Sequence, residues 1–133
     1  DIGGPSMVRS AAKNFKSVTV ITDKKDYSEL IKELKKLRGR TTLNFRKKMA
    51  SKAFNLTAYY DAIVSEWFNR DVGQEFPERK TFFGKKISQL RYGENPHQKS
   101  SMYINSLKND DINLQQLSGK DLSYNNYNDI FAG

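Results

Sequence analysis

A long stretch of this chain, from about residue 42 to about residue 68, limits the possible folds more than any other. Its apolar residues recur at helical spacing: Leu43, Met49, Ala50, Ala53, Phe54, Ala58, Ile63, Val64 and Trp67. This period predicts one long amphipathic helix. The segment 69–77 that follows is polar, contains Gly73 and Pro77, and reads as a linker. A chain of 133 residues holds one ordinary domain or two incomplete ones. We therefore divide it into residues 1–72 and 73–133.

The first part is expected to be α/β. Gly4-Pro5 is a helix-start signal, and the apolar residues up to Phe15 continue at helical spacing. Residues 18–21 (VTVI) are β-branched and apolar on both faces, which predicts a buried parallel strand. A further helix is expected between Asp26 and Gly39. Helix, strand, helix, helix is an α/β pattern.

The second part is expected to contain strands at 80–83 and 101–104, on either side of the segment 91–98 (RYGENPHQ). A polar turn is expected at 105–111. The last residues, 128–133, resemble the opening of a helix that does not develop.

The segment 91–98 combines a fixed cation, a phenol, a glycine, two amide side chains and the only histidine of the chain. Its pairs Tyr92-Gly93 and Asn95-Pro96 favour turns, so we expect a shaped loop and not a helix face. By itself, this composition also suits a polar turn between two strands.

Three segments together are more specific. They are 1–14 (DIGGPSMVRSAAKN), 91–98 and 119–126 (GKDLSYNN). In this order and at these distances they resemble the bifunctional purine-biosynthesis family, which joins an IMP cyclohydrolase to an AICAR transformylase. The resemblance implies the end of a methylglyoxal-synthase-like parallel α/β domain, followed by the start of a cytidine-deaminase-like α/β transformylase domain. It also implies an internal fragment in which neither active site is complete.

For the cyclohydrolase, the resemblance implies that Lys13 is the acid of ring closure. In that reaction a carboxamide nitrogen attacks a formyl carbon, and the formyl oxygen must be protonated before it leaves as water. An ammonium stabilises the developing charge and supplies that proton. The resemblance further implies that Asp1 and Ile2 contact the nucleotide. A lone lysine on a helix is otherwise most often a solvated surface residue.

For the transformylase, the resemblance implies that Arg91, Tyr92 and Asn125 bind AICAR. A guanidinium binds phosphate or carboxamide groups through paired hydrogen bonds, and an amide supplies both a donor and an acceptor. His97 is a possible ligand contact, although a loop-ordering role fits it better. The family implies 10-formyltetrahydrofolate as the co-substrate, no metal in this segment, a homodimer, and a cytoplasmic location.

Composition leaves a rival class open. The formal charge is +8, and nine basic residues crowd one stretch: Lys32, Lys35, Lys36, Arg38, Arg40, Arg46, Lys47, Lys48 and Lys52. We call them the basic cluster. Such a cluster suits a small nucleic-acid-binding module, but also the solvated faces of two amphipathic helices. A structural module at a dimer interface is a third possibility.

The absence of cysteine excludes a disulfide framework and a thiol nucleophile in this chain. No apolar run approaches the ~20 residues that span a bilayer.

Overall fold

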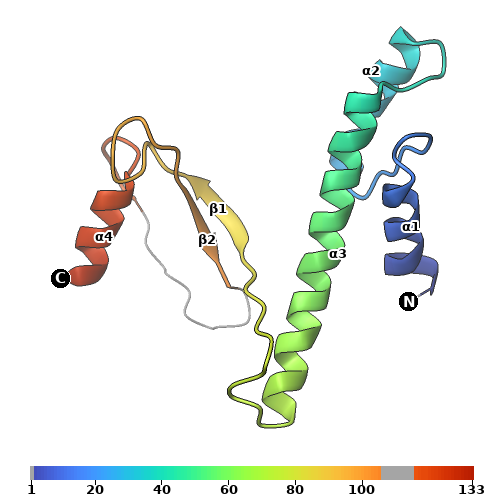
Figure 1. Cartoon of the computed structure of the whole chain (residues 1–133). Helices are drawn as coiled ribbons and strands as arrows, with labels where there is room; N and C mark the ends of the chain where they lie inside the picture. The colour runs from blue at the N-terminus through green and yellow to red at the C-terminus, as the bar shows by residue number, and fades with distance from the viewer. Residues whose placement is uncertain (1, 106–115) are drawn as a thin grey trace. The chain divides into compact units, whose positions relative to one another are not determined.

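The computed structural model describes residues 2–105 and 116–133. The chain divides into two compact units, Asp1–Thr81 and Phe82–Gly133 (Figure 1). This division follows packing alone, and the limits of the two enzyme domains at residues 72 and 73 stay a prediction. Helices occur in both units and strands in the second, so the chain as a whole mixes both elements, as an α/β class requires.

Helices make up the first unit. They are η1, a π-helical turn (Ile2–Ser6), α1 (Met7–Lys13), η2, a 3₁₀ turn (Lys24–Asp26), α2 (Tyr27–Lys36) and α3 (Leu43–Asp71). The helices expected from the periodicity are confirmed. The first begins earlier than expected, because Pro5 lies inside the π turn and not at the first α-helical position.

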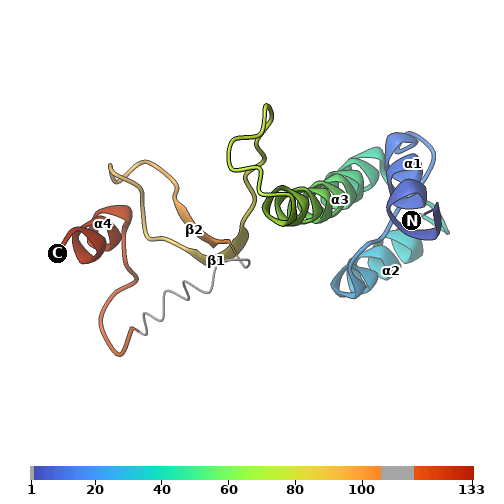
Figure 2. The ribbon, with the colours of Figure 1, turned by 90° about the horizontal axis from the view of Figure 1, so that it is seen from below.

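The core of this unit lies where α1 packs beside the N-terminal half of α3 (Figure 1, Figure 2). Ala12 and Ala53 are completely buried there, together with Ala50. Short side chains at the contact let the two helix backbones approach closely. Half-buried apolar side chains surround the three alanines: Val8, Phe15, Val20 and Phe54.

The parallel strand expected at 18–21 is wrong. These residues form neither helix nor strand, although they are half-buried. Val20 packs on the alanine core, and the Thr19 hydroxyl is hydrogen-bonded to the Thr41 hydroxyl at 2.8 Å. A strand needs a neighbouring strand to complete its ladder of hydrogen bonds, and the described residues of this unit contain none. The β-branched residues 18–21 therefore correctly indicated that this segment is partly buried, but they did not indicate whether it pairs with another strand.

A tight corner joins α2 to α3. Gly39 adopts a positive φ of 86° and donates its N–H to the Leu34 carbonyl at 2.8 Å, which closes the end of α2. Thr42 then caps α3 by accepting the Phe45 N–H at 3.2 Å. The Glu33 carboxylate accepts the Thr42 hydroxyl and, at 2.8 Å, the Thr42 N–H. These hydrogen bonds, the hydroxyl first, lower the pKa of Glu33 below its usual value of 4.5.

The long helix is confirmed and extends slightly further than expected. α3 continues to Asp71, so the first residues of the expected linker are helical. It ends where Gly73 takes a φ of 68° and Gln74 donates its N–H to the Asn69 carbonyl at 2.8 Å. Residues 72–84 contain no helix or strand.

The second unit contains an antiparallel pair of strands, β1 (Lys85–Gln89) and β2 (Ser101–Ile104), and the helix α4 (Tyr124–Ala132). The strand expected at 101–104 is confirmed. The one expected at 80–83 is wrong, because pairing starts at Lys85, opposite Ile104. Phe82 is 89% exposed, and residues 80–83 form no strand.

The chain end also differs from expectation, since α4 is a formed helix that starts at Tyr124. Ser123 caps it, and the pair Ser123 and Asn126 forms a complete capping box. The turn expected at 105–111 lies outside the described residues from position 106 onward.

Candidate functional site

The segment 91–98 is a loop that closes on itself, as its turn pairs predicted. Gly93 donates its N–H to the Gln98 carbonyl at 2.9 Å, and Gln98 donates its N–H to the Asn95 carbonyl at 3.0 Å. The Asn95 N–H donates to Oε1 of Gln98 at 2.9 Å. A Cβ on Gly93 would come within 2.9 Å of the Gln98 Cβ. Glycine is therefore required where the two ends of this loop meet.

Backbone hydrogen bonds join this loop to the segment that starts α4. Arg91 donates its N–H to the Leu122 carbonyl at 3.0 Å, and Tyr124 donates its N–H to the Tyr92 carbonyl at 3.1 Å. The side chain of Asn125 donates through Nδ2 to the Glu94 carbonyl at 3.1 Å. Arg91, Tyr92 and Asn125, the three residues predicted to bind AICAR, are thus brought together although 31 residues separate Glu94 from Asn125.

The side chains of Arg91 and Tyr92 pack on each other, and the guanidinium of Arg91 stays exposed to solvent. The guanidinium carbon of Arg91 lies 4.8 Å from the centre of the Tyr92 ring. Nη2 of Arg91 donates to the Tyr92 hydroxyl at 3.2 Å. Arg91 is exposed while Tyr92 is half-buried. A guanidinium carries five N–H donors, so most of them remain available to an anionic or carboxamide ligand.

An open hollow of about 460 Å³ lies beside the loop. Its lining comes from the loop, from the residues after it, and from the start of α4: Gly93, Glu94, Gln98, Lys99, Ser100 and Tyr124. Tyr124 is the residue whose N–H is bonded to Tyr92. His97 is exposed in the turn at the tip of the loop.

The residues predicted for the cyclohydrolase belong to the first unit. Lys13 is the last residue of α1 and is exposed, directly after the buried Ala12. Ile2 opens the π turn and is 83% exposed. Asp1 lies outside the described residues. Ile2 and Lys13 stand at opposite ends of the helical run formed by η1 and α1, so the structure does not bring these two together.

Comparison with known proteins decides the family. The model of the AICARFT/IMPCHase bienzyme family matches residues 11–133. The chain belongs to this family.

Individual relatives agree. A protein named bifunctional purine biosynthesis protein PurH from Bradyrhizobium diazoefficiens is 48% identical over 133 residues, which is 99% of this chain and 25% of the relative. Its namesake from Clostridioides difficile is 50% identical over 131 residues, 98% of this chain and 25% of the relative. That from Cereibacter sphaeroides is 48% identical over 133 residues, with shares of 99% and 25%. The chain spans about a quarter of the length of these bienzyme relatives.

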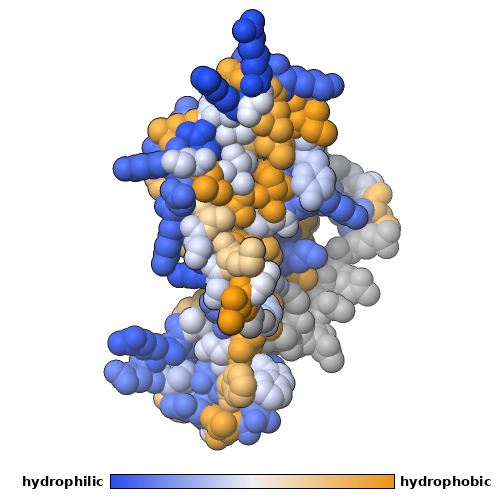
Figure 3. All heavy atoms as spheres, turned by 90° about the vertical axis from the view of Figure 1, so that its right-hand side faces the viewer, coloured by the Kyte–Doolittle hydropathy of each residue, from blue (hydrophilic) through white to orange (hydrophobic). Residues whose placement is uncertain are grey.

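Several members of the basic cluster make contacts within the first unit. Arg46 donates to the carbonyls of Phe15 and Lys16 at 2.9 Å each, which ties the turn after α1 to α3. Lys48 forms an ion pair with Glu29 at 2.7 Å. Lys52 pairs with Asp26, whose side chain is 7% exposed. On the face seen in Figure 3, hydrophilic side chains project around the rim of a more hydrophobic middle.

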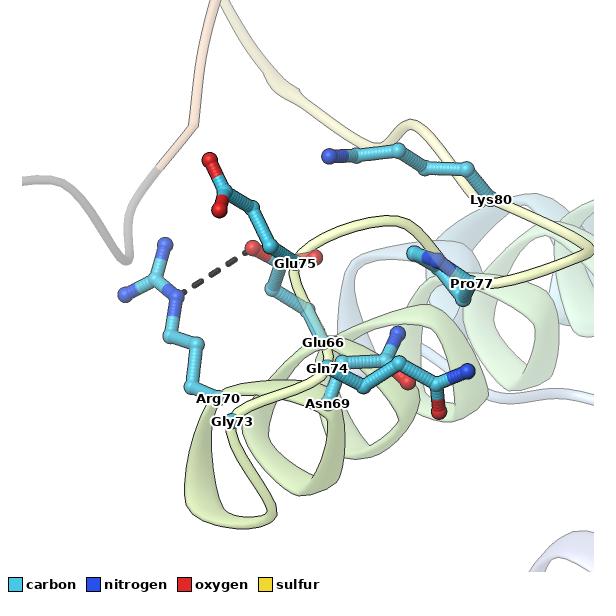
Figure 4. A pocket seen from close by; sticks show the side chains of 8 residues that line it. All are labelled: Glu66, Asn69, Arg70, Gly73, Gln74, Glu75, Pro77 and Lys80. Carbon is cyan, nitrogen blue, oxygen red and sulfur yellow. Dashed lines mark hydrogen bonds and ion pairs between the residues drawn. The ribbon is translucent and has the colours of Figure 1, made fainter.

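A second hollow, of about 330 Å³, lies at the end of α3 (Figure 4). Its charges are of both signs: Arg70 is paired with Glu66 at 3.2 Å, and Lys80 reaches in from the following segment. It contains none of the residues that the bienzyme resemblance assigns to a site. Among residues 2–105 and 116–133, no group of three or more acidic, histidine or cysteine side chains is arranged to hold a metal ion.

No helix in the described part of the chain combines the length and the apolar character that a bilayer crossing requires.

The sequence did not lead us to predict two features that hold the site in place. The Gln98 side chain closes the loop, and nothing in the octamer marks that amide as different from the others. The Ser123-x-x-Asn126 pattern was a usable signal, because Ser followed three residues later by a polar side chain is typical of a helix N-terminus. Ser123 is 1% exposed.

Proposed function

We propose that this chain is the junction segment of a bifunctional enzyme that performs the last two steps of IMP synthesis. The first step transfers a formyl group from 10-formyltetrahydrofolate to AICAR, and the second closes the ring of FAICAR with loss of water. The observation that carries the proposal is the joining of the segment that holds Arg91 and Tyr92 to the segment that holds Asn125. Two backbone hydrogen bonds and one from the Asn125 side chain connect them. A polar turn that only connects two strands does not require such bonds to a second, distant segment.

In the transformylase half, Arg91 and Tyr92 bind the AICAR nucleotide. The exposed guanidinium offers a planar fork to phosphate or carboxamide oxygens, and its position over the Tyr92 ring limits its motion. Asn125 uses one N–H on the Glu94 carbonyl. Its Oδ1 and its second N–H remain for a carboxamide, which needs both a donor and an acceptor. His97 is proposed to order the loop or to line the site, and not to act as the general base.

In the cyclohydrolase half, Lys13 donates the proton to the formyl oxygen, and Asp1 and Ile2 contact the nucleotide. Because Ile2 and Lys13 lie at opposite ends of the run formed by η1 and α1, a ligand that touches both must extend along this run. The groups that complete both active sites lie outside the chain, so the fragment alone is proposed to be inactive.

Several finer assignments belong to the same proposal. Residues 1–72 are the end of a methylglyoxal-synthase-like cyclohydrolase domain, and residues 73–133 are the linker and the start of a cytidine-deaminase-like transformylase domain. The complete enzyme is a cytoplasmic homodimer that acts on small-molecule purine nucleotides. It needs no metal in this segment, and it has no specific nucleic-acid partner. Three members of the basic cluster are used within the fold, which speaks against the nucleic-acid alternative.

The test is to express the complete protein that carries this chain and to measure both reactions. Formyl transfer to AICAR and cyclisation of FAICAR should both be present. A complete protein with neither activity, but with salt-resistant and sequence-selective binding to DNA or RNA, would favour the alternative. Weak binding that disappears with added salt would not, since any chain with this charge shows it.

A further inference from the structure

One side chain shapes the loop that carries the predicted AICAR ligands. The Oε1 atom of Gln98 accepts the Asn95 N–H at 2.9 Å, while the Gln98 carbonyl accepts the Gly93 N–H at the same distance. The Gln98 side chain also lies against Gly93, since a Cβ built on that glycine would meet the Gln98 Cβ at 2.9 Å and Oε1 at 3.2 Å. Gln98 therefore determines the course of the loop between Gly93 and Asn95.

The middle of that loop is the part that touches Asn125. Glu94 lies between the two residues that Gln98 binds, and its carbonyl receives the Asn125 side chain at 3.1 Å. Gly93, at the other end, directly follows Tyr92, whose carbonyl receives the Tyr124 N–H at 3.1 Å. A change in the loop would consequently displace Asn125 relative to Arg91 and Tyr92.

We propose that Gln98 is a positioning residue for AICAR binding, acting through its side-chain oxygen on the loop that holds Tyr92 and Asn125. This inference rests on the proposed function. Gln98 itself supplies no group to the reaction. Its effect is on the spacing of the groups that bind the nucleotide, and errors in such spacing weaken binding.

Two variants of the complete enzyme separate the oxygen from the rest of the side chain. Gln98→Leu keeps a branched side chain, one bond shorter, but removes the acceptor, whereas Gln98→Glu keeps an acceptor at the same place. Gln98→Leu should raise the KM for AICAR roughly three- to tenfold, the range expected for one lost hydrogen bond. The kcat should change by less than about twofold, and FAICAR cyclisation should be unchanged. Gln98→Glu should restore most of the KM.

Two readouts distinguish positioning from simple damage to the fold. Hydrogen exchange of the amides in residues 91–98 should become faster in Gln98→Leu and return toward the parental rate in Gln98→Glu. Gly93→Ala, which forces a methyl group against the Gln98 Cβ, should raise the KM for AICAR at least as much as Gln98→Leu. Gln74→Leu makes the same change at an exposed glutamine of the other unit, and serves as the matched control.

The outcomes are distinct. A parental enzyme without formyl transfer would refute the proposed function itself. If the parental enzyme is active and Gln98→Leu has the parental KM, the positioning role alone is wrong. It is also wrong if Gln98→Glu is as impaired as Gln98→Leu, because the acceptor would then not be what matters. A raised KM and faster loop exchange in Gln98→Leu, both restored by Gln98→Glu, support the role.

Discussion

Replacing Arg91 with alanine should weaken AICAR binding without unfolding the loop that carries it. Among the described residues, the Arg91 guanidinium donates a hydrogen bond to the Tyr92 hydroxyl at 3.2 Å, and its central carbon lies 4.8 Å from the centre of the ring. An exposed cation–π contact contributes only about 0.5–1 kcal/mol. The backbone N–H of residue 91, which bonds to Leu122, is kept in the variant. The lost hydrogen bond adds a comparable amount, so stability should fall by only about 1–2 kcal/mol.

The loss in binding should be larger than the loss in stability. A charge-assisted hydrogen bond to a ligand contributes about 1.5–3 kcal/mol, which corresponds to roughly a ten- to a hundredfold rise in the KM for AICAR. Arg91→Lys should recover only part of this, because an ammonium cannot reproduce the planar fork. Cyclisation of FAICAR should stay near the parental rate, since Lys13 belongs to the other unit.

Steady-state assays of both reactions on the same preparation provide the test, with Arg79→Ala as a matched control at an exposed arginine outside the loop. Thermal unfolding of each variant checks that the fold is intact. Equal loss of both activities would show that Arg91 supports folding or assembly. A KM unchanged by Arg91→Ala would refute its assignment as a ligand.

The remaining predictions concern both units. Lys13→Ala should slow FAICAR cyclisation by ~10²–10⁴-fold, the usual cost of losing a general acid, and leave formyl transfer nearly intact; a parental cyclisation rate would return Lys13 to the status of a surface lysine. The pKa of Glu33 is lowered by its hydrogen bonds from Thr42, so the unfolded state binds this proton more readily. The stability that Glu33 contributes is therefore complete above a pH of about 4.5 and lost as the pH falls through the lowered pKa of the folded state. Thermal unfolding of Glu33→Gln should lack that part of the acid dependence, and identical profiles would contradict the assignment. Ser123→Ala should cost on the order of 1 kcal/mol and speed hydrogen exchange of the α4 amides roughly fivefold, whereas Ser123→Gly should cost only a few tenths of a kcal/mol.

Local patterns predicted those parts of the fold that depend on local interactions. The apolar period of 42–68 determined α3, because a helix satisfies its own backbone within a few residues. The same holds for the turn pairs of 91–98, whose closure involves only Gly93, Asn95 and Gln98.

Features that depend on a distant partner were not predictable in this way. The run 18–21 had the composition of a strand, but a strand also needs a second strand, and residue type does not reveal whether one is present. The 80–83 prediction failed for the same reason, since β1 is defined by its register with 101–104. The bond from Asn125 to Glu94 links positions 31 residues apart. The family resemblance, and not the spacing, indicated that these two segments belong to one site.

The length of α3 has a consequence for how this stretch can vary among relatives. α1 is fixed to the N-terminal half of α3 by Ala12, Ala50 and Ala53, and the chain leaves the helix at its other end, after Asp71. Each residue inserted or deleted between Ala53 and Asp71 would rotate the exit by about 100° around the helix axis and shift it by about 1.5 Å. Seven residues make nearly two whole turns and leave a phase error of only about 20°. Length changes in this part of the helix should therefore favour steps of seven or eleven residues, each of which leaves a phase error of only about 20°.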